Sequence, residues 1–317
     1  MTQNQHSNQL TLTRIYDAPV EAVWEAWTDP KQVAQWWGPR GFTITTHSKD
    51  LRKGGHWKYT MHGPDGTDYP NTTQYFEVIE NSLLVYDHGG NDNAPPLFRV
   101  RAEFAEINGK TQLEMTMTFA TPDAVLEVKK IIKKASGEST WDRLAEYLDK
   151  ALNGKETFVI NRTFNASIET LFNVWTDPLH LSRWLSPTGT EMTFIEADIR
   201  AGGSSFYRMF NADVNMYGKI QYKEIKQPDR IVYTQQFCDE NGAISRHPLA
   251  PTWPETMLTT ILFSPESATQ TRVTITWEAY GPTTESELQT FIDARAGMTQ
   301  GWTGSFDKLE EYLVFTI

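Results

Sequence analysis

Hydrophobic and polar residues alternate along several short stretches of the chain, and this alternation predicts β-strands. Residues 10–16 alternate and are rich in β-formers, while Trp57, Tyr59 and Met61 are separated by polar residues and therefore share one strand face. The Asn108-Gly109 dipeptide between two such stretches is typical of a two-residue hairpin turn. Consecutive hairpins predict an antiparallel meander. Further strands are predicted at residues 42–51, 74–79, 83–88, 97–107 and 111–119.

The whole pattern occurs twice. The sequence VWEAWTDPKQVAQWW at residues 23–37 returns as LFNVWTDPLHLSRWL at residues 171–185. In both copies an Asp precedes a Pro (Asp29 and Asp177), which predicts a helix that ends and a second short helix that begins with an Asp N-cap and Pro at its first position. Strands are predicted in the second copy at residues 157–164, 191–199, 219–225, 231–237, 255–264 and 271–280.

Each copy ends in a stretch with hydrophobic residues at helical spacing, which predicts one long helix over residues 122–152 and another over 284–314. A long helix covering a curved antiparallel sheet makes an α+β domain. We therefore predict two tandem α+β domains, at residues 10–152 and 156–317, joined by a very short linker. A length of 317 residues suits two domains of ordinary size.

Composition and charge exclude several classes of partner. With 29 Lys and Arg against 40 Asp and Glu the net charge is −11, and no basic run interrupts it, so we expect no nucleic-acid or anionic-membrane partner. No apolar run approaches the roughly 18–20 residues that span a bilayer, so we expect no membrane insertion. The polar start of the chain lacks the apolar core of a secretory signal, which favours a cytoplasmic protein. The single Cys238 is interpreted as a small buried hydrophobe.

Motifs at corresponding places in the two copies resemble those of a known family. The chain is similar to the AHSA-type (activator of heat-shock ATPase homologue) family of the SRPBCC, or START-like and birch-pollen-allergen-like, superfamily. The matching residues of the first copy are Arg14, Ala18-Pro19, Val23-Trp24, Trp27-Thr-Asp-Pro30, Trp36, Asp50-x-Arg52-x-Gly54-Gly55 and Asp65-Gly66. The matching residues of the second copy are Trp175-Thr-Asp-Pro178, Trp184, Asp198-x-Arg200-x-Gly202-Gly203 and Gly301-Trp302.

The resemblance implies a helix-grip fold, in which a strongly bent antiparallel sheet grips a long C-terminal helix, two short helices support the bend, and a cavity lies between sheet and helix. Members of the wider superfamily bind lipids, hormones or polyketides, and a few are cyclases or hydrolases, so the fold alone does not decide function. The second copy keeps the Gly-Trp motif of the helix, which the first copy lacks, and has Gly218 where the first has Pro70-Asn71. We therefore expect a retained ligand site in the second copy. Its Pro-rich loop at residues 246–254 is expected to border the cavity mouth.

Strand alternation sends aromatic and Met side chains inward together, which suits a mostly apolar pocket but also suits plain core filling. Trp36, Trp37 and Trp184 are interpreted as core packing. The candidate ligand-binding residues of the first copy are Trp57, Tyr59, Met61, Met115 and Met117. Those of the second copy are Tyr207, Met209, Tyr233, Ile275 and Trp277 on strands, facing Met298 and Trp302 on the helix.

No residue set indicates a reaction, so no catalytic residue, cofactor or metal is predicted. His47, His56 and His62 crowd one hairpin but lack ligand spacing and have no counterparts in the second copy, so they are interpreted as surface residues. Asp50 with Arg52, like Asp198 with Arg200, is interpreted as a structural pair beside a turn and not as an acid–base dyad. No nucleophile triad or phosphate loop is present.

The sequence thus predicts a protein that binds a small apolar or aromatic molecule. Two alternatives remain open: a cyclase- or hydrolase-type enzyme that uses the same cavity, and a chaperone-associated interaction module. The second is disfavoured because the heat-shock ATPase activators carry a further domain ahead of this one, whereas only about nine polar residues precede the first predicted strand here.

Overall fold

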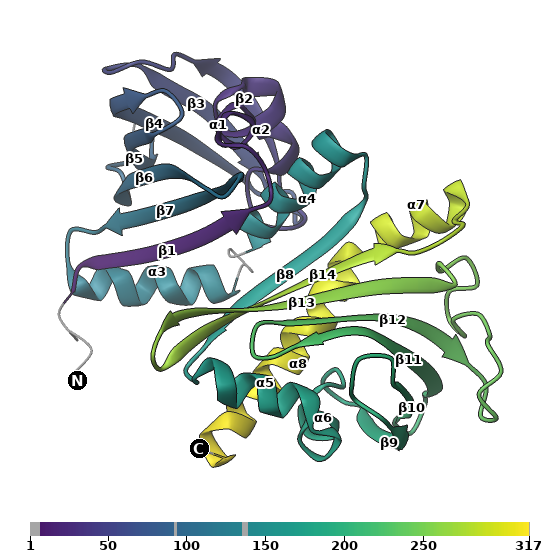
Figure 1. Ribbon diagram of the computed structural model, residues 1–317. Coiled ribbons are helices and arrows are strands. Elements are labelled where there is room, and N and C mark those ends of the chain that lie inside the picture. The colour runs from purple at the N-terminus through teal and green to yellow at the C-terminus, as the bar shows by residue number, and fades with distance from the viewer. Residues whose placement is uncertain (1–6, 92–93, 135–138, 317) are drawn as a thin grey trace. The chain divides into compact units, whose positions relative to one another are not determined.

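The computed structural model describes residues 7–91, 94–134 and 139–316, and the chain divides into two compact units, one up to Gly154 and one from Lys155 (Figure 1). Each unit contains a seven-stranded sheet in which all pairs of neighbouring strands are antiparallel. The strand orders are β1-β7-β6-β5-β4-β3-β2 and β8-β14-β13-β12-β11-β10-β9, so the topology repeats. The predicted antiparallel meander and the tandem helix-grip fold are confirmed.

The first unit consists of β1 (Gln9–Tyr16), α1 (Val20–Thr28), α2 (Pro30–Trp36), β2 (Thr43–Lys49), β3 (His56–His62), β4 (Asp68–Ile79), β5 (Leu83–Gly90), β6 (Phe98–Ile107), β7 (Lys110–Thr118), α3 (Pro122–Lys134) and α4 (Ser139–Asn153). The second unit consists of β8 (Thr157–Phe164), α5 (Ile168–Thr176), α6 (Pro178–Trp184), β9 (Glu191–Ala197), β10 (Ser204–Phe210), β11 (Asn215–Lys226), β12 (Arg230–Cys238), β13 (Thr256–Ser267), β14 (Gln270–Ala279), α7 (Glu285–Asp293) and α8 (Arg295–Thr316).

The break between the two short helices of each unit forms as the Asp-Pro pattern predicts. The Asp29 carboxylate accepts hydrogen bonds from the backbone N–H groups of Lys31 (2.8 Å) and Gln32 (2.9 Å), and Asp177 accepts one from Leu179 (2.8 Å). These bonds satisfy N–H groups that the first helical turn leaves free. Each N-cap therefore restarts the chain as a second helix beside the edge of its sheet.

The glycine pair between the second and third strands of each unit is required by close backbone approach. Gly54 and Gly202 have φ of +79° and +81°, which L side chains rarely adopt. A Cβ on Gly55 would lie 2.1 Å from the Asp50 carbonyl oxygen. Only glycine fits this turn, which explains why the pair recurs.

The long helix predicted at the end of the second copy is divided into α7 and α8, which corrects that expectation. In the first unit α3 and α4 lie on either side of residues 135–138, which fall outside the described residues. In the second unit α7 ends at Asp293, and the Ala294 N–H reaches both the Thr290 and the Ile292 carbonyl oxygen. Ala294 has a ψ of −7°, where an α-helix has about −42°, and neither Pro nor Gly marks this break, so residue spacing did not predict it. Figure 1 shows α8, in yellow, crossing the face of the second sheet.

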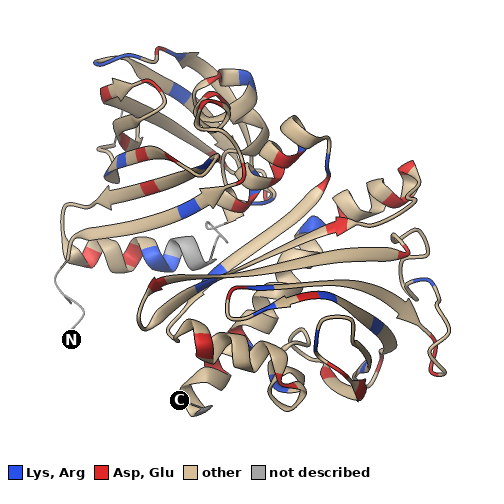
Figure 2. Ribbon diagram, in the orientation of Figure 1, with Lys and Arg blue, Asp and Glu red and all other residues tan. Residues whose placement is uncertain are grey.

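Each unit buries its own hydrophobic core between sheet and helices. Trp36 and Trp184, at the ends of α2 and α6, are fully buried and donate their Nε1–H to the carbonyl oxygens of Ala26 (3.0 Å) and Val174 (3.2 Å). The packing role predicted for these two rings is confirmed. Among the described residues no helix is both long and apolar enough to cross a membrane. Figure 2 shows basic and acidic residues interspersed over both units in this view.

Candidate functional site

A cavity of about 370 Å³ lies in the second unit, between the sheet and α8. The volume is within the range of small-molecule sites, near its lower end. Its wall is mostly aromatic and aliphatic, with a few neutral polar groups. It is lined by Leu185, Pro187, Met192, Tyr207, Met209, Ile220, Tyr233, Gln235, Phe237, His247, Trp253, Met257, Trp277, Ala294, Gly297, Met298, Gly301, Trp302 and Ser305.

The sheet side of the cavity is built by strand alternation. Tyr207 and Met209 on β10, and Tyr233, Gln235 and Phe237 on β12, each lie two residues apart and therefore point to the same face. β11 runs between these two strands, and its Ile220 pairs with Gln235.

Space for the cavity arises where Tyr207 faces a glycine. Tyr207 pairs across the strands with Gly218, and a Cβ on Gly218 would lie 2.3 Å from the Tyr207 hydroxyl oxygen. The phenol ring therefore lies flat over β11 instead of rising toward the helix. The glycine that distinguishes the second copy thus makes room for this ring, which lies on the sheet as part of the cavity wall.

The helix side is built by one face of α8. Gly297, Gly301 and Ser305 recur every four residues, and Met298 and Trp302 flank them. The Trp302 ring stacks on Trp175 at 6.3 Å between centroids and meets Trp277 edge-on at 5.7 Å. An added Cβ would meet nothing within 4 Å at Gly297, and only the Pro187 ring at 3.8 Å at Gly301. The glycines therefore leave open space where other helix residues would fill it.

Residues 246–253, which we name the strap, close one side of the cavity. Its His247 and Trp253 line the wall, and Trp253 also packs edge-on against Phe291 of α7 at 5.8 Å. The strap is anchored to α7 by an ion pair between Arg246 and Glu287 (2.5 Å) and by a hydrogen bond between the hydroxyls of Thr252 and Thr290 (2.8 Å). Its own backbone bonds, from Ala250 to His247 and from Trp253 to Ala250, stay within the strap.

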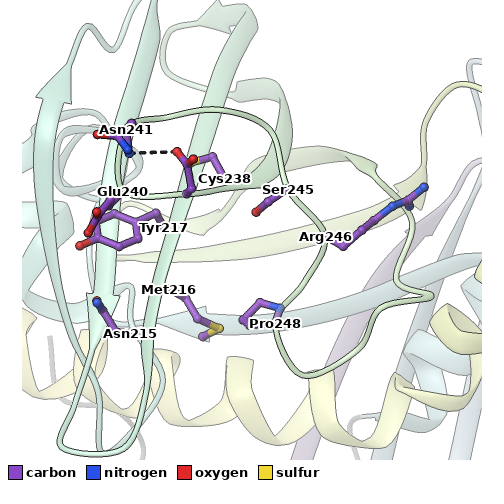
Figure 3. A pocket seen from close by; sticks show the side chains of 10 residues that line it. Asn215, Met216, Tyr217, Cys238, Glu240, Asn241, Ser245, Arg246 and Pro248 are labelled. Atoms are coloured by element: carbon purple, nitrogen blue, oxygen red, sulfur yellow. Dashed lines mark hydrogen bonds between the residues drawn. The ribbon is translucent and has the colours of Figure 1, made fainter.

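A second, more polar pocket of about 340 Å³ borders the strap, with Arg246 and Pro248 among its lining residues (Figure 3). Figure 3 places Met216 next to Pro248, while Arg246 points away from the other labelled residues. Asp239 is engaged in its own turn, because its carboxylate accepts from the backbone N–H groups of Asn241 and Ala243, both at 2.9 Å. Burial raises the pKa of the Cys238 thiol, which disfavours the reactive thiolate. This pocket therefore presents no assembled chemistry.

The titratable groups of the cavity wall are neutral at pH 7. Burial raises the pKa of both Tyr207 and Tyr233 above the ordinary value of a phenol. Burial also lowers the pKa of His247, whose Nδ1 accepts a hydrogen bond from the Leu249 N–H at 3.0 Å. The wall therefore offers hydrogen bonds without charge.

The sequence profile of the family described as "Activator of Hsp90 ATPase homolog 1-like protein" matches residues 17–149 and 165–314, one segment in each unit. The chain belongs to this AHSA1 family. The predicted family and its tandem arrangement are confirmed. A comparison with curated proteins returned no match.

Several solved structures resemble this AHSA1 protein. One, from Nitrosomonas europaea, is 23% identical, covers 47% of this chain and 98% of its own, and gives a TM-score of 0.42. A protein from Arthrobacter aurescens is 21% identical, with 49% and 94% covered and a TM-score of 0.44. The di-domain ARO/CYC protein BexL of the BE-7585A biosynthetic pathway is 12% identical, with 96% and 98% covered and a TM-score of 0.39. At these scores the family assignment rests on the sequence profile.

The structure places most of the candidate ligand-binding residues of the second AHSA1 unit around one cavity. Its wall includes six of them: Tyr207, Met209, Tyr233, Trp277, Met298 and Trp302. Ile275 is not among the lining residues, because it is fully buried in the core.

The candidates of the first AHSA1 unit are packed into its core. Trp57 and Tyr59 are 2% and 1% exposed and stack on each other at 4.0 Å between centroids. Trp37 packs edge-on against Trp57 at 5.3 Å and donates its Nε1–H to the Tyr59 hydroxyl at 3.2 Å. Met115 and Met117 are buried in the same cluster, and Met61 packs at its edge.

The second unit has smaller residues where the first has two of these indoles. Leu185 stands at the place of Trp37 and Ser205 at that of Trp57, as the repeat aligns them. Of these two smaller residues, Leu185 lines the cavity, so the Trp37 indole fills in the first unit a place that lies on the cavity wall in the second. The sequence allowed two interpretations of the candidate residues, a ligand pocket and plain core filling. Core filling describes those of the first unit.

Some wall residues were not predicted individually. Gln235 lies two residues beyond Tyr233 on β12, so strand alternation could have identified it. His247 and Trp253 lie on the Pro-rich loop expected to border the cavity, but their contact with the wall depends on anchors to α7 that local sequence does not reveal.

The histidines of the first hairpin make local surface bonds. His47 bonds Thr60 (2.9 Å), His56 bonds Ser48 (3.3 Å) and His62 bonds Asp68 (2.7 Å). Within the described part of the chain no group of three or more His, Cys, Asp or Glu residues could hold a metal ion.

The two Asp-Arg pairs beside the glycine turns are ion pairs on the surface. Asp50 pairs with Arg52 and Asp198 with Arg200, both at 2.9 Å. Both partners of each pair are well exposed, so the structural interpretation made from the sequence agrees with their position.

Proposed function

We propose that this AHSA1 protein binds a small uncharged apolar or aromatic molecule in the cavity of its second unit. The observation that carries the proposal is the wall itself: Trp277 and Trp302 meet edge-on beside Met298, while Gly297 and Gly301 leave room on α8. Concave, mostly apolar walls with a few fixed polar groups are typical of small-molecule sites. A cytoplasmic location, as expected from the sequence, is part of this proposal.

The first unit serves in this proposal as a packed partner domain. Trp27 contacts Trp36, Trp37 and Trp141 at 5.4–5.6 Å between ring centroids. Rings packed so closely contribute hydrophobic burial and edge-to-face contacts to stability. We therefore expect one bound molecule per chain.

Native mass spectrometry of the purified chain, followed by denaturation and extraction, tests the proposal. We expect one small molecule per chain, and we expect the variant Gly301→Leu, whose side chain would extend into the cavity, to lose it. Gln300→Leu, on the exposed side of the same helical turn, is the matched control and should keep it. Equal ligand content in Gly301→Leu and Gln300→Leu would overturn the proposed site, provided that both variants melt as cooperatively as the wild type.

The same experiment separates binding from the enzymatic alternative. A binding protein returns an added ligand unchanged after prolonged incubation, whereas a cyclase or hydrolase returns a product of different mass or retention. We expect unchanged ligand, because the titratable groups on the wall, Tyr207, Tyr233 and His247, are all held neutral and lack a charged partner among the lining residues.

A further inference from the structure

We infer that the ligand carries a hydrogen-bonding oxygen on an aromatic ring, as an uncharged phenol or aryl ketone does, and that the Tyr207 hydroxyl and the Gln235 amide recognise this oxygen. This inference rests on the proposed function and specifies the ligand class of the same cavity.

The charge of the ligand follows from the wall. None of the described lining residues is Asp, Glu, Lys or Arg, and burial keeps His247, Tyr207 and Tyr233 neutral. A charged ligand would lose its hydration there and find no opposite charge, which is strongly unfavourable. An uncharged molecule avoids this penalty.

The Tyr207 hydroxyl is the first recognition group. In the first unit the corresponding Tyr59 hydroxyl accepts the Trp37 Nε1–H at 3.2 Å. The place of Trp37 is taken in the second unit by Leu185, which has no donor. Tyr207 is only 6% exposed, and its hydroxyl has no hydrogen-bond partner among the described residues. Tyr207 lines the cavity, so a ligand or water in the cavity can supply the partner that the protein does not.

The Gln235 amide is the second recognition group. Gln235 is half-buried on β12, and its cross-strand partners are the apolar Ile220 and Met257. In the part of the chain that the structure describes, its amide makes no hydrogen bond with the protein. A primary amide has N–H donors and a carbonyl acceptor. It can therefore both donate to and accept from a phenol hydroxyl, and it can donate to a ketone oxygen.

The two groups lie over the same part of the sheet. The Tyr207 ring extends over Gly218, and Gly218 and Ile220 are the inward-facing neighbours on β11. Gln235 pairs across the strands with Ile220. Its amide is therefore a diagonal neighbour of Gly218, and the Tyr207 hydroxyl lies over Gly218. Trp302, across the cavity on α8, supplies an aromatic surface. A flat ring against this indole would direct an oxygen toward both polar groups.

The test compares three probes of one shape, naphthalene, 2-naphthol and 2-naphthoate, by titration calorimetry on the full chain. We expect 2-naphthol to bind at least tenfold more tightly than either of the others. In Tyr207→Phe and in Gln235→Leu we expect the preference for 2-naphthol over naphthalene to fall toward unity. The matched control Tyr222→Phe removes a buried hydroxyl of the same unit that bonds Ser205 at 3.2 Å and does not line the cavity, so it should keep the preference.

The outcomes distinguish this inference from the proposal beneath it. Equal binding of naphthalene and 2-naphthol, unchanged in Tyr207→Phe and Gln235→Leu, would overturn the polar recognition and leave a purely apolar site. Tightest binding by 2-naphthoate would overturn the uncharged class. Binding of no probe, together with a bare native mass, would overturn the proposed function and the inference with it. Melting curves of each variant show whether a loss of preference comes with a loss of fold.

Discussion

The hydroxyl of Tyr207 approaches its cross-strand partner Gly218 so closely that a single added methyl group at residue 218 would collide with it at 2.3 Å. The corresponding pair of the first unit is Tyr59 and Asn71, where the Tyr ring packs instead on Trp57. A one-residue difference on β11 therefore accompanies two different placements of the same phenol ring. The second placement leaves a cavity beside it.

We expect Gly218→Ala to displace the Tyr207 ring toward α8. The added Cβ cannot be accommodated without a shift, and overpacking of this kind costs about 1–3 kcal/mol of stability. Ligand binding should weaken by tenfold or more, because the displaced ring enters the cavity. Calorimetric titration and thermal melting measure the two effects. The double variant Gly218→Ala with Tyr207→Ala removes the colliding ring and should recover part of the stability, whereas an unaltered affinity in Gly218→Ala alone would contradict the role of this glycine.

We expect Gly301→Ala to stabilise the chain while making the cavity smaller. Ala is favoured over Gly inside a helix by about 0.8–1 kcal/mol, and the new Cβ meets only the Pro187 ring at an ordinary contact distance of 3.8 Å. Denaturant unfolding should therefore show a gain near this value, and bulky ligands should bind less tightly. A loss of stability would show that α8 and the loop that carries Pro187 pack more closely here than the distance indicates.

We expect the first unit to lose stability as the pH falls from about 6.5 toward 4. Burial against Trp37 and Phe98 lowers the pKa of His88 to about 4, whereas the unfolded chain takes up the proton near 6.5. Below pH 6.5 the folded state therefore binds fewer protons than the unfolded state. The contribution of His88 to stability is fully present above pH 6.5 and is lost as the pH falls, by roughly 3 kcal/mol at pH 4.

The variant His88→Gln is the control for this pH dependence, because Gln235 holds the same place in the second unit. It should flatten the slope of stability against pH between 6.5 and 4, whatever its effect at pH 7. Denaturant unfolding at a series of pH values measures the slope. An undiminished slope would mean that other groups cause it.

We expect Glu287→Gln to loosen the strap. The Glu287 carboxylate accepts from the Thr284 N–H (2.8 Å) in a capping box, and from the Arg246 guanidinium (2.5 Å), which anchors the strap. Removing its charge should lower the melting temperature and speed ligand dissociation several-fold, as followed by stopped-flow displacement. Glu285→Gln, an equal change of charge at an exposed site of the same helical turn, should leave the dissociation rate alone.

The sequence predicted the fold well because local rules dominate there. Alternation identified the strands, and Asp-Pro and Gly-Gly fixed the short helices and the turns, since each depends on nearby residues. The interruption at Ala294 was missed because no residue type marks it. The site depends on contacts between distant segments. The strap is held at the cavity by contacts with α7, such as the ion pair between Arg246 and Glu287. Whether an inward Tyr fills a core or lines a cavity depends on the residue across the strand.

The cavity also makes the two units unequal under hydrostatic pressure. Pressure favours the state of smaller volume, and the volume lost on unfolding scales with the internal void that disappears. The second unit, with about 370 Å³ beside Trp302, should therefore unfold at lower pressure than the first, where the buried Trp37 stands at the place of the wall residue Leu185. A molecule that occupied the void would raise the unfolding pressure of the second unit alone.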